Sequence, residues 1–120
     1  MLSERMDAYT THRLSELEAE ALGILQEEAA EVIQEASKIR RSGPDFCRKN
    51  TEVGNMEHFQ MEIEDFRLLL EICAHLGMYR EPSEEWKAEY RRKKLIKLDQ
   101  WSKLGPVISD IQRVSRRNPA

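Results

Sequence analysis

The stretch that decides the fold is residues 24–35, Ile-Leu-Gln-Glu-Glu-Ala-Ala-Glu-Val-Ile-Gln-Glu. At helical spacing, one stripe of side chains runs through this stretch and extends before it. The stripe begins apolar and then becomes acidic without a break, in the order Leu17, Ala21, Ile24, Glu28, Glu31, Glu35. Carboxylates on a face that should be buried are costly unless they are paired or bind a metal.

A second stretch, residues 55–76, repeats this pattern. Its stripe is His58, Glu62, Asp65, Leu69, Ile72, Leu76. Two acids three residues apart again interrupt an apolar seam. If the two helices face each other, four carboxylates converge, and oxygen ligands of this kind suit a hard divalent cation. The predicted ligands are Glu28, Glu31, Glu62 and Asp65.

Length and composition bound the fold class. The chain has 120 residues, 40% hydrophobic and 34% charged, and its few Gly and Pro residues cluster between periodic stretches. We expect one all-α domain over residues 1–120. No run approaches the roughly 18 apolar residues that a membrane span needs, and the start has no apolar signal region. The prediction is a cytoplasmic protein without a membrane partner. Cys47 and Cys73 are too few for a disulfide framework, and Cys73 reads as a core residue.

Capping and stop signals predict three main helices and a short C-terminal segment. The first helix starts after Thr10 or Thr11, or at a capping box of Ser15 and Glu18, and runs to about Arg41. This is long for a globular helix, which leaves room for a bend near Gly23. The other predicted elements are a loop over 42–54, a helix capped by Asn55 and ending near Gly77, a helix capped by Ser83 and ending near Leu104–Pro106, and a weak helical pattern over Val107–Val114.

Charge is distributed unevenly along the chain. Residues 1–86 hold 9 Lys and Arg against 19 Asp and Glu, whereas residues 87–120 hold 10 against 3. An acidic metal-binding part beside a basic phosphate-binding part would produce this split, and so would a solvated basic last helix. The acidic majority and the single narrow basic strip argue against a nucleic-acid partner.

Several enzyme classes lack their motifs. The sequence has no Gly-x-Ser-x-Gly elbow, no Gly-x-x-x-x-Gly-Lys loop and no His-Glu-x-x-His. A di-iron carboxylate bundle needs Glu-x-x-His pairs, which the three histidines do not supply. With oxygen ligands alone, Mg²⁺ is the expected metal, and Mn²⁺ is the alternative.

Three local patterns carry a family resemblance. They are Glu28-x-x-Glu31 within residues 24–33, Glu62-x-x-Asp65 within residues 55–65, and Lys94-x-x-Lys97-Leu-x-x-Trp101-Ser. In this order they resemble the all-α nucleoside triphosphate pyrophosphohydrolases of the MazG type, particularly the small MazG-like proteins of bacteriophages. The similarity covers about residues 14–104, so residues 105–120 form a C-terminal extension. Thirty residues separate Glu31 from Glu62, slightly more than usual, and Glu64 stands where relatives often have Gly.

The resemblance implies a function and roles for residues. The expected reaction is metal-dependent hydrolysis of a (d)NTP to the monophosphate and pyrophosphate, with a lean to a purine deoxynucleotide such as dGTP, in the host cytoplasm if a phage encodes the chain. It implies a MazG-like bundle completed in a homo-dimer or homo-tetramer. The catalytic base would be Glu31 or Glu35, and the phosphate ligands would be Lys94 and Lys97. The nucleobase would be read by Asn55, His58, Phe59 and Trp101.

Two other function classes stay open. The same helices would also suit a module that binds a nucleotide or metal without turnover, and metal-dependent binding without product would indicate that class. A structural helical oligomer, with its acids as surface charges, is the other. In that case divalent cations and nucleotides would leave the melting temperature unchanged.

Overall fold

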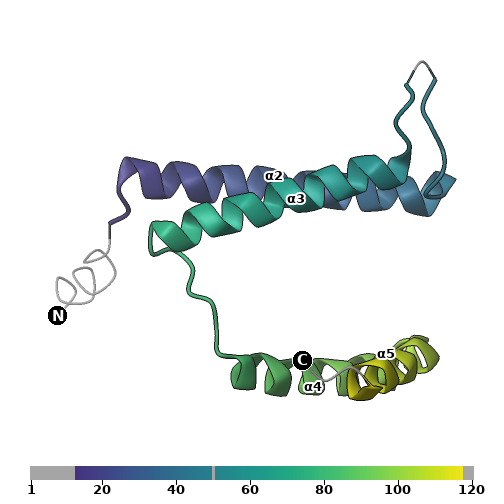
Figure 1. Ribbon diagram of the computed structural model, residues 1–120. Coiled ribbons are helices and arrows are strands. Elements are labelled where there is room, and N and C mark those ends of the chain that lie inside the picture. Colours follow the sequence, from purple (N-terminus) through teal and green to yellow (C-terminus); the bar gives the residue numbers. More distant parts are fainter. Residues whose placement is uncertain (1–12, 50, 118–120) are drawn as a thin grey trace. The chain divides into compact units, whose positions relative to one another are not determined.

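The computed structural model describes residues 13–49 and 51–117, and the regular elements there are helices, apart from one isolated bridge between Cys47 and Gly54. The helices are α2 (Glu16–Ser42), α3 (Asn55–His75), α4 (Glu84–Trp101) and α5 (Gly105–Arg117), drawn in Figure 1. The all-α prediction is therefore confirmed. Contacts divide the chain into two compact units at the Arg80–Glu81 junction. A single domain over residues 1–120 stays a prediction.

The start of α2 is set by the predicted capping box. The Ser15 hydroxyl accepts from the Glu18 N–H at 3.1 Å, and the Glu18 carboxylate accepts from the Ser15 N–H at 2.7 Å. The alternative caps, Thr10 and Thr11, lie outside the described residues. No break occurs at Gly23, because α2 continues to Ser42.

The connection between α2 and α3 explains why the expected cap of α3 was wrong. Gly54, not Asn55, precedes the helix, and no side chain caps it. The Asn55 N–H instead donates to the Phe46 carbonyl, and the Met56 N–H to the Pro44 carbonyl, both at 2.9 Å. Carbonyls of the connecting loop thus take the place of a capping side chain, which leaves the Asn55 amide for another contact.

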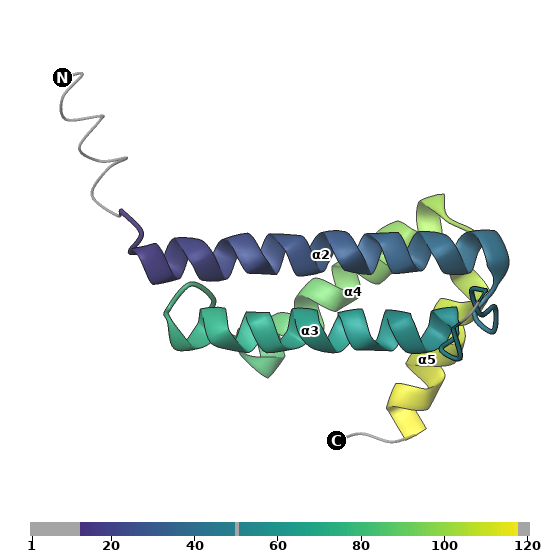
Figure 2. The same ribbon diagram turned by 90° about the horizontal axis from the view of Figure 1, so that it is seen from above.

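The end of α3 is a Schellman motif. Gly77 has φ +80°, which an L side chain rarely adopts. Its N–H donates to the Ala74 carbonyl at 3.0 Å, and the Met78 N–H donates to the Cys73 carbonyl at 2.8 Å. The preceding helix runs antiparallel to α2 and lies beside it in both views (Figures 1 and 2). Cys73 is fully buried in this unit, as predicted for a core residue.

The second unit begins with the predicted cap, since the Ser83 hydroxyl accepts from the Trp86 N–H at 3.1 Å. Its first helix, α4, ends at Trp101, slightly before the predicted end, because the backbone of Ser102 is extended. The C-terminal segment is a helix, α5, longer than the predicted Val107–Val114 pattern. It packs on α4, and Ile108 is its buried apolar residue.

Burial of apolar side chains is sparse. Among the described residues, the apolar ones less than a tenth exposed are Ala21, Cys73 and Ile108. Leu17 and Ile33 on α2 are each 67% exposed, and Leu68 on α3 is 54% exposed. In the part of the chain that the structure describes, no helix has both the length and the apolar content to cross a membrane.

Candidate metal-binding carboxylate site

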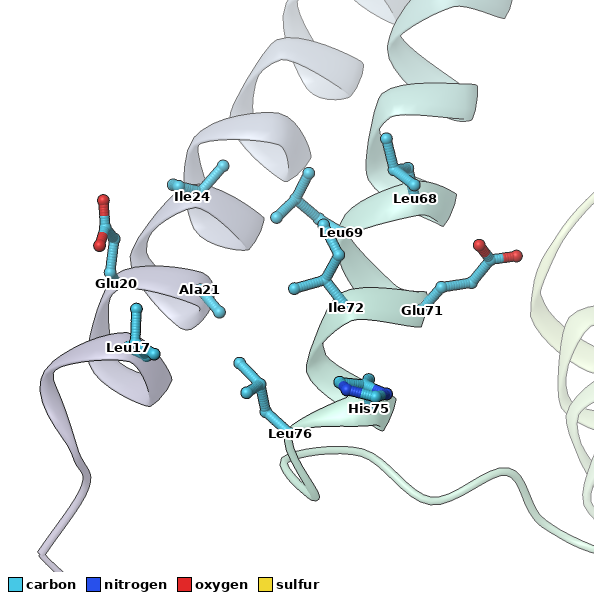
Figure 3. Close-up of a pocket in the computed structure, with 10 residues that line it drawn as sticks. All are labelled: Leu17, Glu20, Ala21, Ile24, Leu68, Leu69, Glu71, Ile72, His75 and Leu76. Carbon is cyan, nitrogen blue, oxygen red and sulfur yellow. The ribbon is translucent and has the colours of Figure 1, made fainter.

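The acidic stripes of α2 and α3 lie at matching levels of the antiparallel helix pair. At one end of the pair lies one apolar groove of about 460 Å³ (Figure 3). Apolar side chains that line it are Leu17, Ala21 and Ile24 of α2, Leu69 and Ile72 of α3, and Leu76, which directly follows α3. At the other end, the Asn55 amide of α3 donates to the Lys38 carbonyl of α2. The four predicted ligands lie between these two ends.

The carboxylates of α2 and α3 come close together between those ends. Glu28, Glu62 and Asp65 each offer a carboxylate oxygen, and these oxygens lie within 4.8 Å of one another. Glu31 lies close to this group, since it is the largest cause of the raised pKa of Glu62. Glu28 and Glu62 are half-buried, whereas Glu31 and Asp65 are exposed. The structure therefore brings the carboxylates of Glu28, Glu62 and Asp65 together, and their role as metal ligands with Glu31 stays a prediction.

The crowding of negative charge raises two pKa values. The hydrogen bond to Glu31, burial, and the charges of Glu31, Asp65 and Glu28 raise the pKa of Glu62 from 4.5 to about 7. Burial, followed by the charges of Glu31 and Asp65, raises the pKa of Glu28. Each shift shows that the ionised form is disfavoured unless a positive charge is nearby.

The chemistry of the donor set fits a divalent cation. One buried carboxylate oxygen of Glu28 and one of Glu62 have no hydrogen-bond partner among the described residues. Buried acceptors of this kind are rare in folded proteins and call for a ligand. The donors are all carboxylate oxygens, the ligands preferred by Mg²⁺ and Mn²⁺.

Glu35, one of the two predicted bases, is placed differently from Glu31. It is one of the two buried polar residues of the described chain. One of its carboxylate oxygens accepts from the Lys38 ammonium at 2.6 Å, and its other oxygen is buried with no partner in residues 13–49 and 51–117. The contribution of Lys38 was missed from the sequence, although its position one turn after Glu35 is a signal for an ion pair.

The predicted nucleobase contacts on α3 differ in how deeply they are buried. Asn55 is only 3% exposed, and its amide nitrogen donates to the carbonyls of Gly43 at 3.0 Å and Lys38 at 3.4 Å. It therefore joins the end of α2 to the start of α3. His58 and Phe59 are half-buried in the next turn. A nucleobase role for these three residues stays a prediction.

The predicted phosphate ligands and Trp101 lie on α4, in the second unit. The Lys94 ammonium sits 5.8 Å from the centre of the Trp101 ring, a cation–π arrangement. Trp101 is 67% exposed, and Lys97 is exposed one turn after Lys94. Elsewhere on α4, Trp86 and Tyr90 stack with ring centres 5.1 Å apart. The roles of Lys94, Lys97 and Trp101 stay predictions.

Comparison with known proteins adds no relative, because no family model, curated protein or solved structure matches this chain. The functional argument therefore rests on the residues and their arrangement.

Proposed function

We propose that the chain is a metal-dependent nucleoside triphosphate pyrophosphohydrolase, related to the MazG type that its motifs resemble. The single observation that carries this proposal is the group of carboxylate oxygens of Glu28, Glu62 and Asp65 within 4.8 Å, contributed by two facing helices. Glu28 and Glu62 each also have a buried oxygen that no donor in the described part of the chain reaches. A surface charge pattern has no need of such buried acceptors.

The cation would be held by Glu28, Glu31, Glu62 and Asp65, and Mg²⁺ is the expected ion, with Mn²⁺ as the alternative. When bound, such an ion neutralises phosphate charge and lowers the pKa of water. The carboxylates themselves repel phosphate oxygens, so they would orient the triphosphate only by fixing the position of the ion. Most of the rate enhancement in phosphoryl transfer comes from such positioning and electrostatics.

The proton acceptor we propose is Glu31. It is exposed, and it lies close enough to Glu62 to raise the pKa of that residue. In the reaction, the oxygen of water would form a bond to the α-phosphorus, and the bond from that phosphorus to the oxygen bridging to the β-phosphate would break. Glu31 would receive one proton of the water. The products are a nucleoside monophosphate and pyrophosphate. Lys94 and Lys97 are proposed to bind phosphate oxygens, and a purine deoxynucleotide such as dGTP is the proposed substrate.

A homo-oligomer is also part of the proposal. The apolar groove at one end of the α2–α3 pair is open, and Leu17, Leu68 and Ile72 around it are 40–67% exposed. Exposed apolar surface of this kind is typical of an interface between subunits. A dimer or tetramer would complete the helical bundle.

The test is pyrophosphate release from the eight common NTPs and dNTPs, with Mg²⁺, with Mn²⁺ and with EDTA. We expect release that needs a metal. Glu28→Gln and Asp65→Asn should each lower turnover by roughly 100-fold or more, because each removes a ligand charge. Glu27→Gln is the matched control, since Glu27 is exposed on the same helix. Circular dichroism should show the same helix content in all variants.

Other outcomes would overturn the proposal. Full turnover by Glu28→Gln or Asp65→Asn would exclude this site. Metal-dependent nucleotide binding without product would indicate a binding module. If neither metal nor nucleotide changed the melting temperature, the carboxylates would be surface charges of a structural protein.

A further inference from the structure

One face of α4 combines aromatic rings with lysine side chains. Its members follow one another at helical spacing, and all of them are exposed. No acidic residue of α4 shares this stripe. We call this face the α4 strip, and along the helix it consists of Trp86, Tyr90, Lys93, Lys94, Lys97 and Trp101. Between its two ends the helix rises by about 22 Å.

The rings of the α4 strip present flat apolar surface to solvent. Trp86 and Tyr90 are both more than half exposed, and their rings stack with centres 5.1 Å apart and planes 6° apart. At the other end, the Lys94 ammonium lies over the ring of Trp101, which is also more than half exposed. Every nucleobase has a flat face that can stack on rings of this kind, whatever the base sequence.

The lysines of the α4 strip are less tied to carboxylates than the arginine behind them. Arg92, on the opposite side of α4, holds the Glu89 carboxylate at 2.8 Å, whereas Lys93 reaches it only at 3.8 Å. In the described part of the chain, no carboxylate lies within ion-pair distance of Lys94 or Lys97. Exposed ammonium groups without a carboxylate can bind phosphate oxygens, which releases the counterions condensed on a nucleic acid.

A ligand that fits the α4 strip has flat rings and negative charges over the length of the strip. Single-stranded nucleic acid has both, and the strip is several times longer than the spacing of phosphates along one strand, about 3.4 Å in a duplex. We propose that the α4 strip binds single-stranded nucleic acid, with bases stacked on the rings and phosphates at the lysines. A duplex keeps its base faces stacked on one another and offers only its phosphates.

Charge and side-chain type support this partner over a membrane surface. The chain as a whole is acidic, which argued against nucleic acid, but residues 81–120, the second unit, hold 10 Lys and Arg against 6 Asp and Glu. A helix that lies on a membrane buries an apolar face that includes aliphatic side chains. The α4 strip has no aliphatic residue.

Tryptophan fluorescence tests the proposal directly, because both tryptophans of the chain lie on the α4 strip. The full chain is titrated in EDTA with oligothymidylate of about 12 nucleotides, with a duplex of the same length and with dTTP. We expect saturable quenching by the single strand, with an affinity at least roughly 10-fold higher than for the duplex or dTTP. The logarithm of the binding constant should fall with the logarithm of salt concentration with a slope of about −2, since three lysines meet single-stranded phosphates.

Three variants separate the α4 strip from charge in general. Lys93→Gln removes one lysine of the strip and should reduce the magnitude of the salt slope by about 0.7. Arg92→Gln, the matched control, removes the same charge from the opposite side of α4 and should leave the slope unchanged. Trp86→Ala should weaken binding by roughly 5- to 150-fold, the loss of one stacked base. Circular dichroism checks that all three variants keep their helix content.

Several results would overturn the proposal. The first is no quenching by the single strand, and the second is an equal affinity for dTTP, because the strip would then hold a mononucleotide. Equal salt slopes of Lys93→Gln and Arg92→Gln would show that net charge alone drives binding. Binding of Trp86→Ala as tight as that of the wild type would exclude stacking. Binding to vesicles of phosphatidylglycerol and phosphatidylcholine, without binding to the single strand, would assign the strip to a membrane surface.

This inference goes beyond the proposed hydrolysis and can fail separately from it. EDTA removes the cation that hydrolysis needs, and Trp86, Tyr90 and Lys93 have no role in that reaction. Binding of the single strand by a protein that hydrolyses no nucleotide would refute the hydrolysis alone. Hydrolysis without binding of the single strand would refute the role of the α4 strip alone.

Discussion

Glu62 shows at the scale of one residue how crowding of carboxylates affects the fold around them. Carboxylate oxygens of Glu28, Glu62 and Asp65 lie within 4.8 Å of one another. Together with the neighbouring Glu31 and burial, they raise the pKa of Glu62 to about 7. The same side chain can therefore hold a proton or face a cation near neutral pH. We expect that a substitution which removes this charge would stabilise the metal-free fold and weaken the binding of a cation.

The first prediction concerns pH. Because the pKa of Glu62 is about 7 when folded and 4.5 ordinarily, the folded state binds the extra proton between these values. The contribution of this group to the free energy of unfolding is therefore present below 4.5 and is lost as pH rises through about 7. We expect the metal-free protein to melt at a higher temperature at pH 6 than at pH 8, measured by circular dichroism.

Two controls isolate that effect. Glu62→Gln should flatten the dependence between pH 6 and pH 8, because the titrating group is gone. Mg²⁺ added at pH 8 should restore the melting temperature of the wild type only, since a cation replaces the proton. A metal-free melting temperature that rises from pH 6 to pH 8, and does so equally in Glu62→Gln, would contradict this account.

The second prediction concerns Asn55. Its buried amide donates to the Gly43 and Lys38 carbonyls at the end of α2. Asn55→Ala leaves these carbonyls without that donor and should lower the free energy of unfolding by about 1–3 kcal/mol, measured with urea. Thr51→Ala removes a comparable but exposed bond to the Arg48 carbonyl, and it should change the free energy by less than about 0.5 kcal/mol. Equal effects of the two variants would refute the structural role.

At the scale of elements, α2 depends on its ends as much as on its apolar face. It is 27 residues long and begins at a complete capping box. Ser15→Ala removes the side-chain half of the box and should reduce stability by about 1 kcal/mol. Ser15→Asp keeps an acceptor at the cap and should stay close to the wild type. Urea unfolding of both variants measures the difference, and a loss as large for Ser15→Asp would show that capping is not the cause.

At the scale of the whole molecule, exposed apolar side chains are the dominant feature. We expect light scattering after size-exclusion chromatography to give the mass of a dimer or tetramer at micromolar concentration, with no monomer. Leu68→Glu places a charge where an apolar side chain is 54% exposed and should shift the protein toward smaller species. Gln60→Glu adds the same charge at an exposed polar position of α3 and should leave the mass unchanged. A monomeric wild type would contradict the oligomer.

The sequence by itself determined the helices and the pairing of acidic residues. Helical periodicity and caps are local, so Ser15, Ser83 and the end near Gly77 were predicted close to where they lie. The stripes through Glu28–Glu31 and Glu62–Asp65 were readable because both acids of each pair share a helical face with apolar residues.

Tertiary structure alone decided how the stripes meet and what surrounds them. The register of α2 against α3 depends on contacts far apart in sequence, which no local pattern encodes. It joined Asn55 to the end of α2, where the sequence predicted a cap, and it buried Glu35, whose ion pair with Lys38 is local to α2. The pKa of Glu62 also depends on that register, because repulsion among carboxylates falls off steeply with distance and becomes large only when the helices pack.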